Sequence, residues 1–400
     1  MLGNKIETKR KDSEPPVDPK FSAFMPKDRV PGYDLARALA LLGMVFINYW
    51  VLVEDPNACP EWLDAVMNFI QGRAAATFVV LAGVGLSLLS RRAYLVKDAA
   101  GIAADRYVLW RRASFLFTIG LLYSMIWPAD ILHFYGIYLA IGAFLLTAPN
   151  RRLWALAIVI SVAFSLFMII TDFDPGEAWG SIDYRDFFNL PRLSRHLFLD
   201  GCYPVFPWVA FMFMGIWLGR KNLSDHSVRN KLLMAGSGAL VFSEFVSKIT
   251  FRLISSAGIG FDLEKVLPLF AIDPWEPMPL FMLSSGGTAL LVIGLSIILA
   301  EKFSRAKWLR PFLAVGQSTL TLYIAHIMVG NIFIEVMKRH DSYLSLFPVW
   351  GVIAFYTSAL AFCLFWRRRF QKGPLEWLMR QFPFFSMPSK AKQGMQPRAV

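Results

Sequence analysis

Charged residues are scarce in this sequence. Asp, Glu, Lys and Arg together make up 18% of its 400 residues, whereas about a quarter is typical of soluble globular domains. Hydrophobic residues make up 56%, and 35 Phe and 13 Trp are among them. This composition excludes an ordinary soluble domain, so the chain length gives no guide to the number of domains.

Cysteine is also rare. The three cysteines are Cys59, Cys202 and Cys363, and their spacing matches neither a metal-binding motif nor a disulfide framework. We therefore expect no bound metal. Isolated thiols are the favoured interpretation, although a Cys59–Cys202 bridge stays open because both residues are expected on the outer side of a membrane.

The apolar residues are gathered in long segments. These are about 18–25 residues long, the length that a helix needs to cross about 30 Å of hydrocarbon. The pattern predicts an all-α, polytopic protein of the inner (cytoplasmic) membrane whose partner is the lipid bilayer. Ten transmembrane helices are expected, at residues 34–53, 65–89, 113–127, 131–148, 153–171, 203–219, 232–250, 279–300, 312–336 and 345–366.

The distribution of basic residues predicts how these spans are oriented. The net charge is +12, which in a membrane protein indicates topology before nucleic-acid binding, so no nucleic acid is expected as a partner. Most Lys and Arg residues fall in the N-terminal segment, in every second connection and in the C-terminal segment. Because basic loops stay in the cytoplasm, both termini are predicted to be cytoplasmic.

The segments outside the spans have a different character. Residues 1–33, which contain KRKDSEPPVDPK, and residues 385–400 are too polar and too rich in charge to pack, so we predict disordered cytoplasmic tails. A transmembrane domain is predicted between them, at 34–384. The connection 172–202 mixes aromatic and acidic residues and is expected to hold a short helix on the outer surface.

Several polar residues are expected inside the outer half of the membrane. A charged side chain at the bilayer centre costs at least about 2.5 kcal/mol, so such groups usually face the interior of the bundle and have a function. Two imidazoles near carboxylates provide what general acid–base catalysis requires. The same groups could instead form structural hydrogen bonds or a proton relay. The residues are Asn48, Asp64, Asp130, His133 and His326.

Arginines are expected at the opposite, cytoplasmic side. Arg37 follows Asp34 by three residues on one helical face. The two form either a helix-end ion pair or a place where Arg37 holds an anionic cofactor. Arginine suits phosphates because its planar guanidinium matches their geometry, but basic residues here also serve topology. Four more arginines are expected on this surface: Arg91, Arg92, Arg111 and Arg112.

Several motifs resemble two related families. RVPGYDLARALALLGMVFINYW at 29–50 and GQSTLTLYIAH at 316–326 resemble the transmembrane acyltransferases typified by heparan-α-glucosaminide N-acetyltransferase, and also the YeiB-like bacterial membrane proteins. WRRRFQKGPLEWLMR at 366–380 resembles the C-terminal Gly-Pro-Leu-Glu-Trp signature of the YeiB-like group. The resemblance extends over about residues 30–380.

The resemblance implies an acyltransferase. Acetyl-CoA or another acyl-CoA would bind from the cytoplasm, and a sugar hydroxyl or an amine, on a glycan or a small molecule, would accept the acyl group on the far side. Asn48 matches an asparagine of the first family span, and Asp64 matches the acid that opens the second. Arginines would hold the acyl-CoA, namely Arg37, Arg73, Arg111 and Arg112.

This sequence departs from the acetyltransferases at one point. They carry a catalytic histidine in the outer loop between the first two spans, whereas the loop here, VLVEDPNACPEW, has none. Either His326 or His133 is then the base, or the chemistry differs, or there is none. In the acyltransferase interpretation Asn48 would steady the oxyanion, and Asp64 or Asp130 would fix the tautomer of a histidine.

Two other functions stay open. The same polar residues could form the path of a proton-coupled transporter or exporter, in which the glycine-rich stretches LAGVGL and LSSGGTALL would mark broken helices. Alternatively, the protein could be a non-catalytic component of an envelope assembly. A homodimer is possible in either case.

Overall fold

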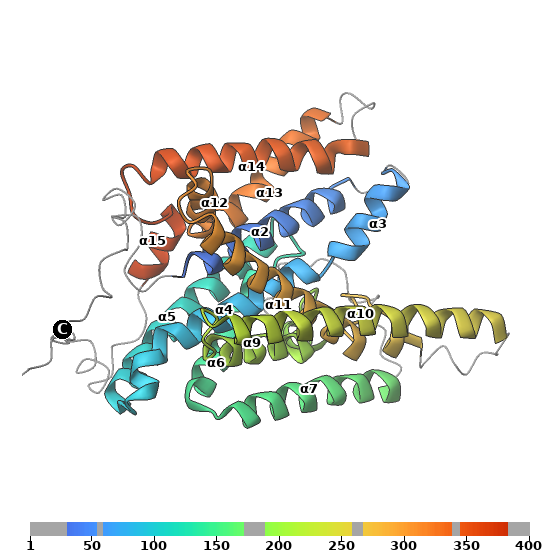
Figure 1. Ribbon diagram of the computed structural model, residues 1–400. Helices are drawn as coiled ribbons and strands as arrows, with labels where there is room; N and C mark the ends of the chain where they lie inside the picture. The colour runs from blue at the N-terminus through green and yellow to red at the C-terminus, as the bar shows by residue number, and fades with distance from the viewer. Residues whose placement is uncertain (1–29, 54–58, 172–188, 258–266, 338–344, 383–400) are drawn as a thin grey trace, which may run out of the picture.

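The protein is helical throughout the part that the structure describes. The computed structural model describes residues 30–53, 59–171, 189–257, 267–337 and 345–382, and no strand occurs among them (Figure 1). The helices are α2 (Pro31–Val51), α3 (Glu61–Ile70), α4 (Arg73–Leu95), α5 (Ala99–Ser124), α6 (Leu132–Phe144), α7 (Asn150–Thr171), α8 (Leu190–Arg195), α9 (Val205–Gly219), α10 (His226–Ala257), α11 (Pro279–Lys302), α12 (Leu309–Gly316), α13 (Thr319–Met337), α14 (Phe347–Trp366) and α15 (Pro374–Gln381).

The helices confirm a multi-pass membrane protein but not the predicted count of ten spans. Seven stretches of the described chain are long and apolar enough to cross a bilayer, or eight if the bent pair Leu190–Asp200 and Val205–Gly219 forms one span. The predicted spans at 113–127 and 131–148 are helical, but α5 has four charged residues among its first fourteen and α6 has only 13 residues. The predicted tails lie almost wholly outside the described residues, although α2 already begins at Pro31.

Two of the predicted spans are interrupted. The span at 65–89 bends between α3 and α4, where Gly72 has a φ of +71° and a Cβ atom would lie 2.6 Å from Pro274. Only glycine adopts this backbone region without strain. The span at 312–336 is divided between α12 and α13. Both interruptions bring polar residues against neighbouring helices.

The glycine-rich stretches do not break their helices. LAGVGL lies within α4 and LSSGGTALL within α11, so the expectation that they mark breaks is wrong. A Cβ atom on Gly215 of α9 would lie 2.1 Å from the carbonyl oxygen of Val80, and one on Gly287 would lie 2.7 Å from that of Gly236. Small residues therefore let α4 approach α9 and α10 approach α11 closely, as is common between membrane helices.

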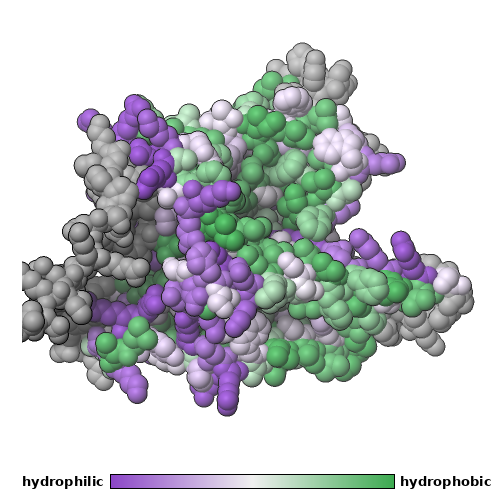
Figure 2. Space-filling view, in the orientation of Figure 1, coloured by the Kyte–Doolittle hydropathy of each residue, from purple (hydrophilic) through white to green (hydrophobic). Residues whose placement is uncertain are grey.

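Polar and apolar side chains occupy different parts of the surface. Figure 2 shows a broad hydrophobic surface along α7 and α10. Hydrophilic side chains gather mainly around the left-hand ends of these helices in that view. Ile158, Val159, Val241 and Phe245 are more than half exposed. Such a surface suits contact with lipid, because exposed apolar patches of this extent are rare on soluble monomers. Cys59, Cys202 and Cys363 are thiols and form no disulfide.

Candidate functional site

A buried hydrogen bond joins Asn48 on α2 to His326 on α13. The Asn48 Nδ2 atom lies 2.9 Å from Nε2 of His326, and the imidazole is fully buried. The Nδ1 atom of His326 faces the carbonyl oxygen of Tyr323, so Nδ1 carries the proton and Nε2 accepts a hydrogen bond from the Asn48 amide. Both ring nitrogens of His326 are therefore occupied.

A second buried pair, Asp130 and His133, stands at the start of α6. Asp130 Oδ2 lies 3.1 Å from Nδ1 of His133 and accepts a hydrogen bond from the backbone N–H of Leu132 at 2.8 Å. Its other oxygen accepts a hydrogen bond from the Tyr323 hydroxyl at 3.2 Å. Neither Asp130 nor His133 is exposed. Asp130 thus orients His133 through its Nδ1 atom and does not contact its Nε2 atom.

The two pairs belong to one network. Tyr323 lies one helical turn before His326, and the centroids of their rings are 5.1 Å apart. Tyr323 also reaches Asp130, so residues from α2, α6 and α13 meet. We call Asn48, Asp130, His133, Tyr323 and His326 the histidine network. Four of these five were singled out from the sequence.

His196, which the sequence analysis missed, lies beside this network. It begins the π-helical turn η4 (His196–Asp200), and its ring stacks on that of His133 with centroids 5.7 Å apart. The Nε2 atoms of both histidines are buried and have no hydrogen-bond partner among the described residues. Hydropathy gave no signal for His196, because a connection that folds back onto the bundle resembles a surface loop in sequence.

Asp64 lies apart from the histidines. Its Oδ1 atom accepts a hydrogen bond from Trp50 Nε1 at 2.9 Å, which ties α3 to the end of α2. Of the two carboxylates predicted to orient a histidine, Asp130 contacts one and Asp64 contacts Trp50 instead. Among the residues that the structure describes, no group of three His, Cys, Asp or Glu side chains could hold a metal ion.

A cavity of about 580 Å³ opens at the end of the bundle where α2 begins and α4 ends. We call this the inner end, after the predicted orientation, and we call the cavity the arginine cavity. Its apolar walls come from α4, α5 and α6. Its polar lining consists of Tyr33, Asp34, Arg37, Arg112, Tyr135 and Arg380.

Positive charge is in excess in the arginine cavity. Arg37 donates a hydrogen bond to Asp34 at 2.9 Å, and Asp34 also accepts one from Gln317 at 2.8 Å. Arg112 has Arg37, Arg111 and Arg380 as neighbouring like charges, and its buried Nε atom has no hydrogen-bond partner in the described chain. Guanidinium groups in this state suit a ligand with phosphate or carboxylate groups.

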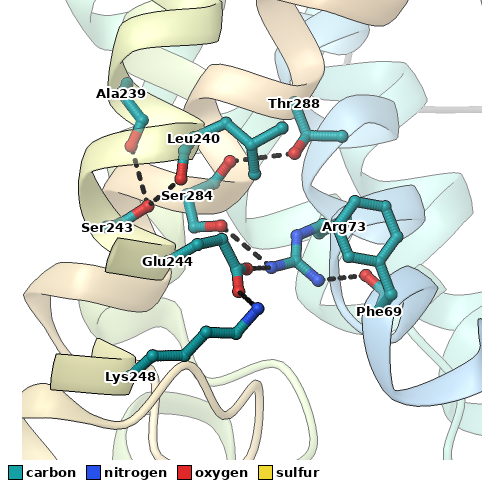
Figure 3. Close-up of polar contacts among 9 residues, drawn as sticks. All are labelled: Phe69, Arg73, Ala239, Leu240, Ser243, Glu244, Lys248, Ser284 and Thr288. Atoms are coloured by element: carbon teal, nitrogen blue, oxygen red, sulfur yellow. Dashed lines mark hydrogen bonds and ion pairs between the residues drawn. The ribbon is translucent and has the colours of Figure 1, made fainter. Parts of the chain in front are cut away.

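Arg73 and Arg111 differ from the other predicted cofactor ligands, because neither lines the cavity. Arg73 instead forms an ion pair with Glu244 of α10 and donates to Ser284 Oγ of α11 at 2.9 Å (Figure 3). Lys248 of α10 lies farther from Glu244, at 3.8 Å. Arg73 is 4% exposed and joins three helices.

Two sequence families match this chain. The family described as "Heparan-alpha-glucosaminide N-acetyltransferase, catalytic" matches residues 29–252, which is more than half of the chain. The protein therefore belongs to this family of membrane acetyltransferase catalytic domains. A second family, described as "Protein of unknown function (DUF418)", matches residues 246–385 and supports the YeiB-like relationship. No curated protein sequence matches the chain.

The two matched regions meet at both polar sites. Asn48 and His133 belong to the first region, and His326 belongs to the second. The arginine cavity likewise takes Arg37 and Arg112 from the first region and Arg380 from the second. Neither site is complete within one region.

Proposed function

We propose that the protein transfers an acyl group from a cytoplasmic acyl-CoA to a hydroxyl or an amine on the other side of the membrane. The observation that carries this proposal is that α2 and α6 contribute to both the arginine cavity and the histidine network. Arg37 and Asn48 lie eleven residues apart on α2, which is about 16 Å along the helix axis. Tyr135 lines the cavity, and His133 lies two residues before it on α6.

The arginine cavity suits the nucleotide end of an acyl-CoA. Its phosphates would bind Arg37 and Arg112, which both line the cavity, and the Nε atom of Arg112 has no hydrogen-bond partner among the described residues. The pantetheine arm is an extended chain and would run along the apolar walls, between α4 and α6, toward the histidine network. The thioester would then reach the depth at which Asn48 and His133 lie.

In this reaction His133 is the base. Because Asp130 holds the proton on Nδ1, the lone pair of Nε2 can accept the proton of the acceptor hydroxyl or amine. The acceptor then attacks the carbonyl carbon of the thioester, the bond from carbon to sulfur breaks, and the CoA thiolate leaves with the proton. His326 is a weaker candidate, since Asn48 already occupies its Nε2 atom.

Asn48 has a second N–H group that His326 does not use. A donor fixed in this way can stabilise the oxyanion that forms as the acceptor attacks. His326 would then act by orienting Asn48, and the Tyr49 hydroxyl, which donates to the carbonyl oxygen of His326 at 2.9 Å, holds the same turn of α13.

The test uses the full-length protein purified in lipid nanodiscs. We expect saturable binding of radiolabelled acetyl-CoA and transfer of its label to an amine or a sugar. His133→Gln should lower the transfer rate by about 10²- to 10⁴-fold while leaving acetyl-CoA binding intact. Absence of saturable acetyl-CoA binding would contradict the proposal, as would undiminished transfer by His133→Gln.

A further inference from the structure

The C-terminal helix α15 is fixed to the N-terminus of α13 by one carboxylate. Glu376 accepts hydrogen bonds from the backbone N–H groups of Leu320 at 2.8 Å and Thr321 at 3.2 Å, and from the Thr321 hydroxyl at 2.6 Å. The first N–H groups of a helix lack partners within the helix, and a negative charge there is favourable. Glu376 therefore caps α13 from a distance of more than fifty residues along the chain.

Each residue of the Gly-Pro-Leu-Glu motif contributes to this attachment. A Cβ atom on Gly373 would lie 2.0 Å from Glu376 Oε2, so only glycine leaves room for the carboxylate. Pro374 occupies the first position of α15, where a missing N–H is harmless. The backbone N–H of Leu375 donates to Thr321 Oγ1 at 3.0 Å. The motif thus serves to attach α15 to the helix that carries His326.

A second contact holds the other end of α15. The ring of Phe382 packs on that of Phe115 of α5, with centroids 5.3 Å apart. With both ends held, Met379 and Arg380 line the arginine cavity opposite Arg112. Figure 1 shows α15 near α5, at the edge of the bundle.

This attachment concentrates positive charge at the cavity. Burial, Arg380 and Arg112 lower the pKa of Lys372, which lies just before α15. Burial also raises the pKa of Glu376, although the hydrogen bonds from Leu320 and Thr321 oppose that rise. Arg37, Arg112 and Arg380 thus bring three guanidinium groups to one cavity, an arrangement that suits a multiply charged anion.

We propose that α15 forms one wall of the acyl-CoA site, with Arg380 binding a phosphate group and Glu376 acting as a positioning residue that holds the helix in place. This inference rests on the proposed function. It gives the C-terminal region, which matches a family of unknown function, a definite task. That task is to complete a binding site whose other walls belong to the acetyltransferase region.

The first experiment measures binding to the full-length protein in nanodiscs by calorimetry. The ligands are CoA, 3′,5′-ADP and pantetheine, which lacks phosphates. Arg380→Gln should weaken CoA and 3′,5′-ADP by about three- to tenfold and leave pantetheine unchanged. The matched control is Arg369→Gln, which removes an exposed arginine outside the cavity and should change neither.

The outcomes separate the two proposals. If wild-type protein binds CoA and Arg380→Gln binds it equally well, the inference about α15 is wrong and the proposed function stands. If wild-type protein does not bind CoA, the proposed function fails and this inference fails with it. A loss of pantetheine binding in Arg380→Gln would also count against a phosphate contact.

The second experiment tests the positioning role of Glu376 by a double-mutant cycle. Glu376→Ala should weaken CoA about as much as Arg380→Gln does, and the double variant should be no weaker than either single variant, because both remove the same contact. Thr321→Val removes the partner hydroxyl instead and should reproduce the loss if Glu376→Ala folds poorly. Losses that add in the double variant would overturn the positioning role.

Discussion

The Nδ2 atom of Asn48 donates a hydrogen bond to the Nε2 atom of His326 across 2.9 Å, although the two residues lie 278 positions apart in the chain. This bond fixes His326 as a neutral imidazole with its proton on Nδ1. It also joins the region that matches the acetyltransferase family to the region that matches the family of unknown function. Substitution of either residue therefore tests whether the two regions act as one domain.

Removing one partner of this bond should destabilise the protein. Asn48→Leu leaves the buried Nε2 atom of His326 unsatisfied, and we expect a loss of about 1–3 kcal/mol. The double variant Asn48→Leu/His326→Leu should recover part of that loss, because no polar atom is then left unpaired. Thermal unfolding in detergent measures both. Equal stability of Asn48→Leu and wild type would contradict the hydrogen bond.

Asp130 should affect the rate rather than donor binding. Asp130→Asn can still accept from Tyr323 but no longer holds the proton on Nδ1 of His133, so the base loses its correct tautomer. We expect kcat to fall by about 10²-fold or more, with the Kd for acetyl-CoA unchanged. The control is Asp64→Asn. Asp64 accepts a hydrogen bond from Trp50 through its Oδ1 atom, which an asparagine can also do, so this variant should retain activity.

Arg73 should support stability and not donor binding. Arg73→Gln leaves Glu244 without its guanidinium partner between α4 and α10, at a cost of about 1–3 kcal/mol, since Glu244 is partly exposed. The Kd for CoA should not change, since Arg73 lies outside the arginine cavity. Lys248→Gln, in which the exposed member of the cluster is replaced, should change stability by less than about 1 kcal/mol. If a stable Arg73→Gln protein binds CoA more weakly, the prediction is wrong and Arg73 contributes to the acyl-CoA site.

Two glycines give a matched pair for the helix contacts. Gly215→Ala places a Cβ atom 2.1 Å from the Val80 carbonyl oxygen and should destabilise the protein by about 1–3 kcal/mol. Gly238→Ala, on α10, meets no heavy atom within 4 Å and should be neutral or stabilising by up to about 1 kcal/mol. Melting temperatures of the two variants in one detergent provide the measurement. A destabilised Gly238→Ala with an unaffected Gly215→Ala would contradict the packing of α4 on α9.

Local signals predicted the helical class and part of the site. Asp130 with His133, and Asp34 with Arg37, are three residues apart, and a helix brings such residues together whatever surrounds it. The number of spans was less predictable. The charges at the start of α5 and the short length of α6 put both helices outside the limits of span length and composition, and the bends at Gly72 and between α12 and α13 depend on their neighbours.

Hydropathy and helical period act over one or two turns of chain, so they are enough to indicate a helical membrane protein with buried ionisable groups. The sequence by itself also determined the family, through motifs that are contiguous. The pairing of His326 with Asn48, the pairing of Arg73 with Glu244, and the place of Arg380 beside Arg37 and Arg112 follow from the fold alone. The reason is that partners on different helices are selected by which faces pack together, and that choice depends on glycine contacts and interhelical hydrogen bonds spread over the whole chain.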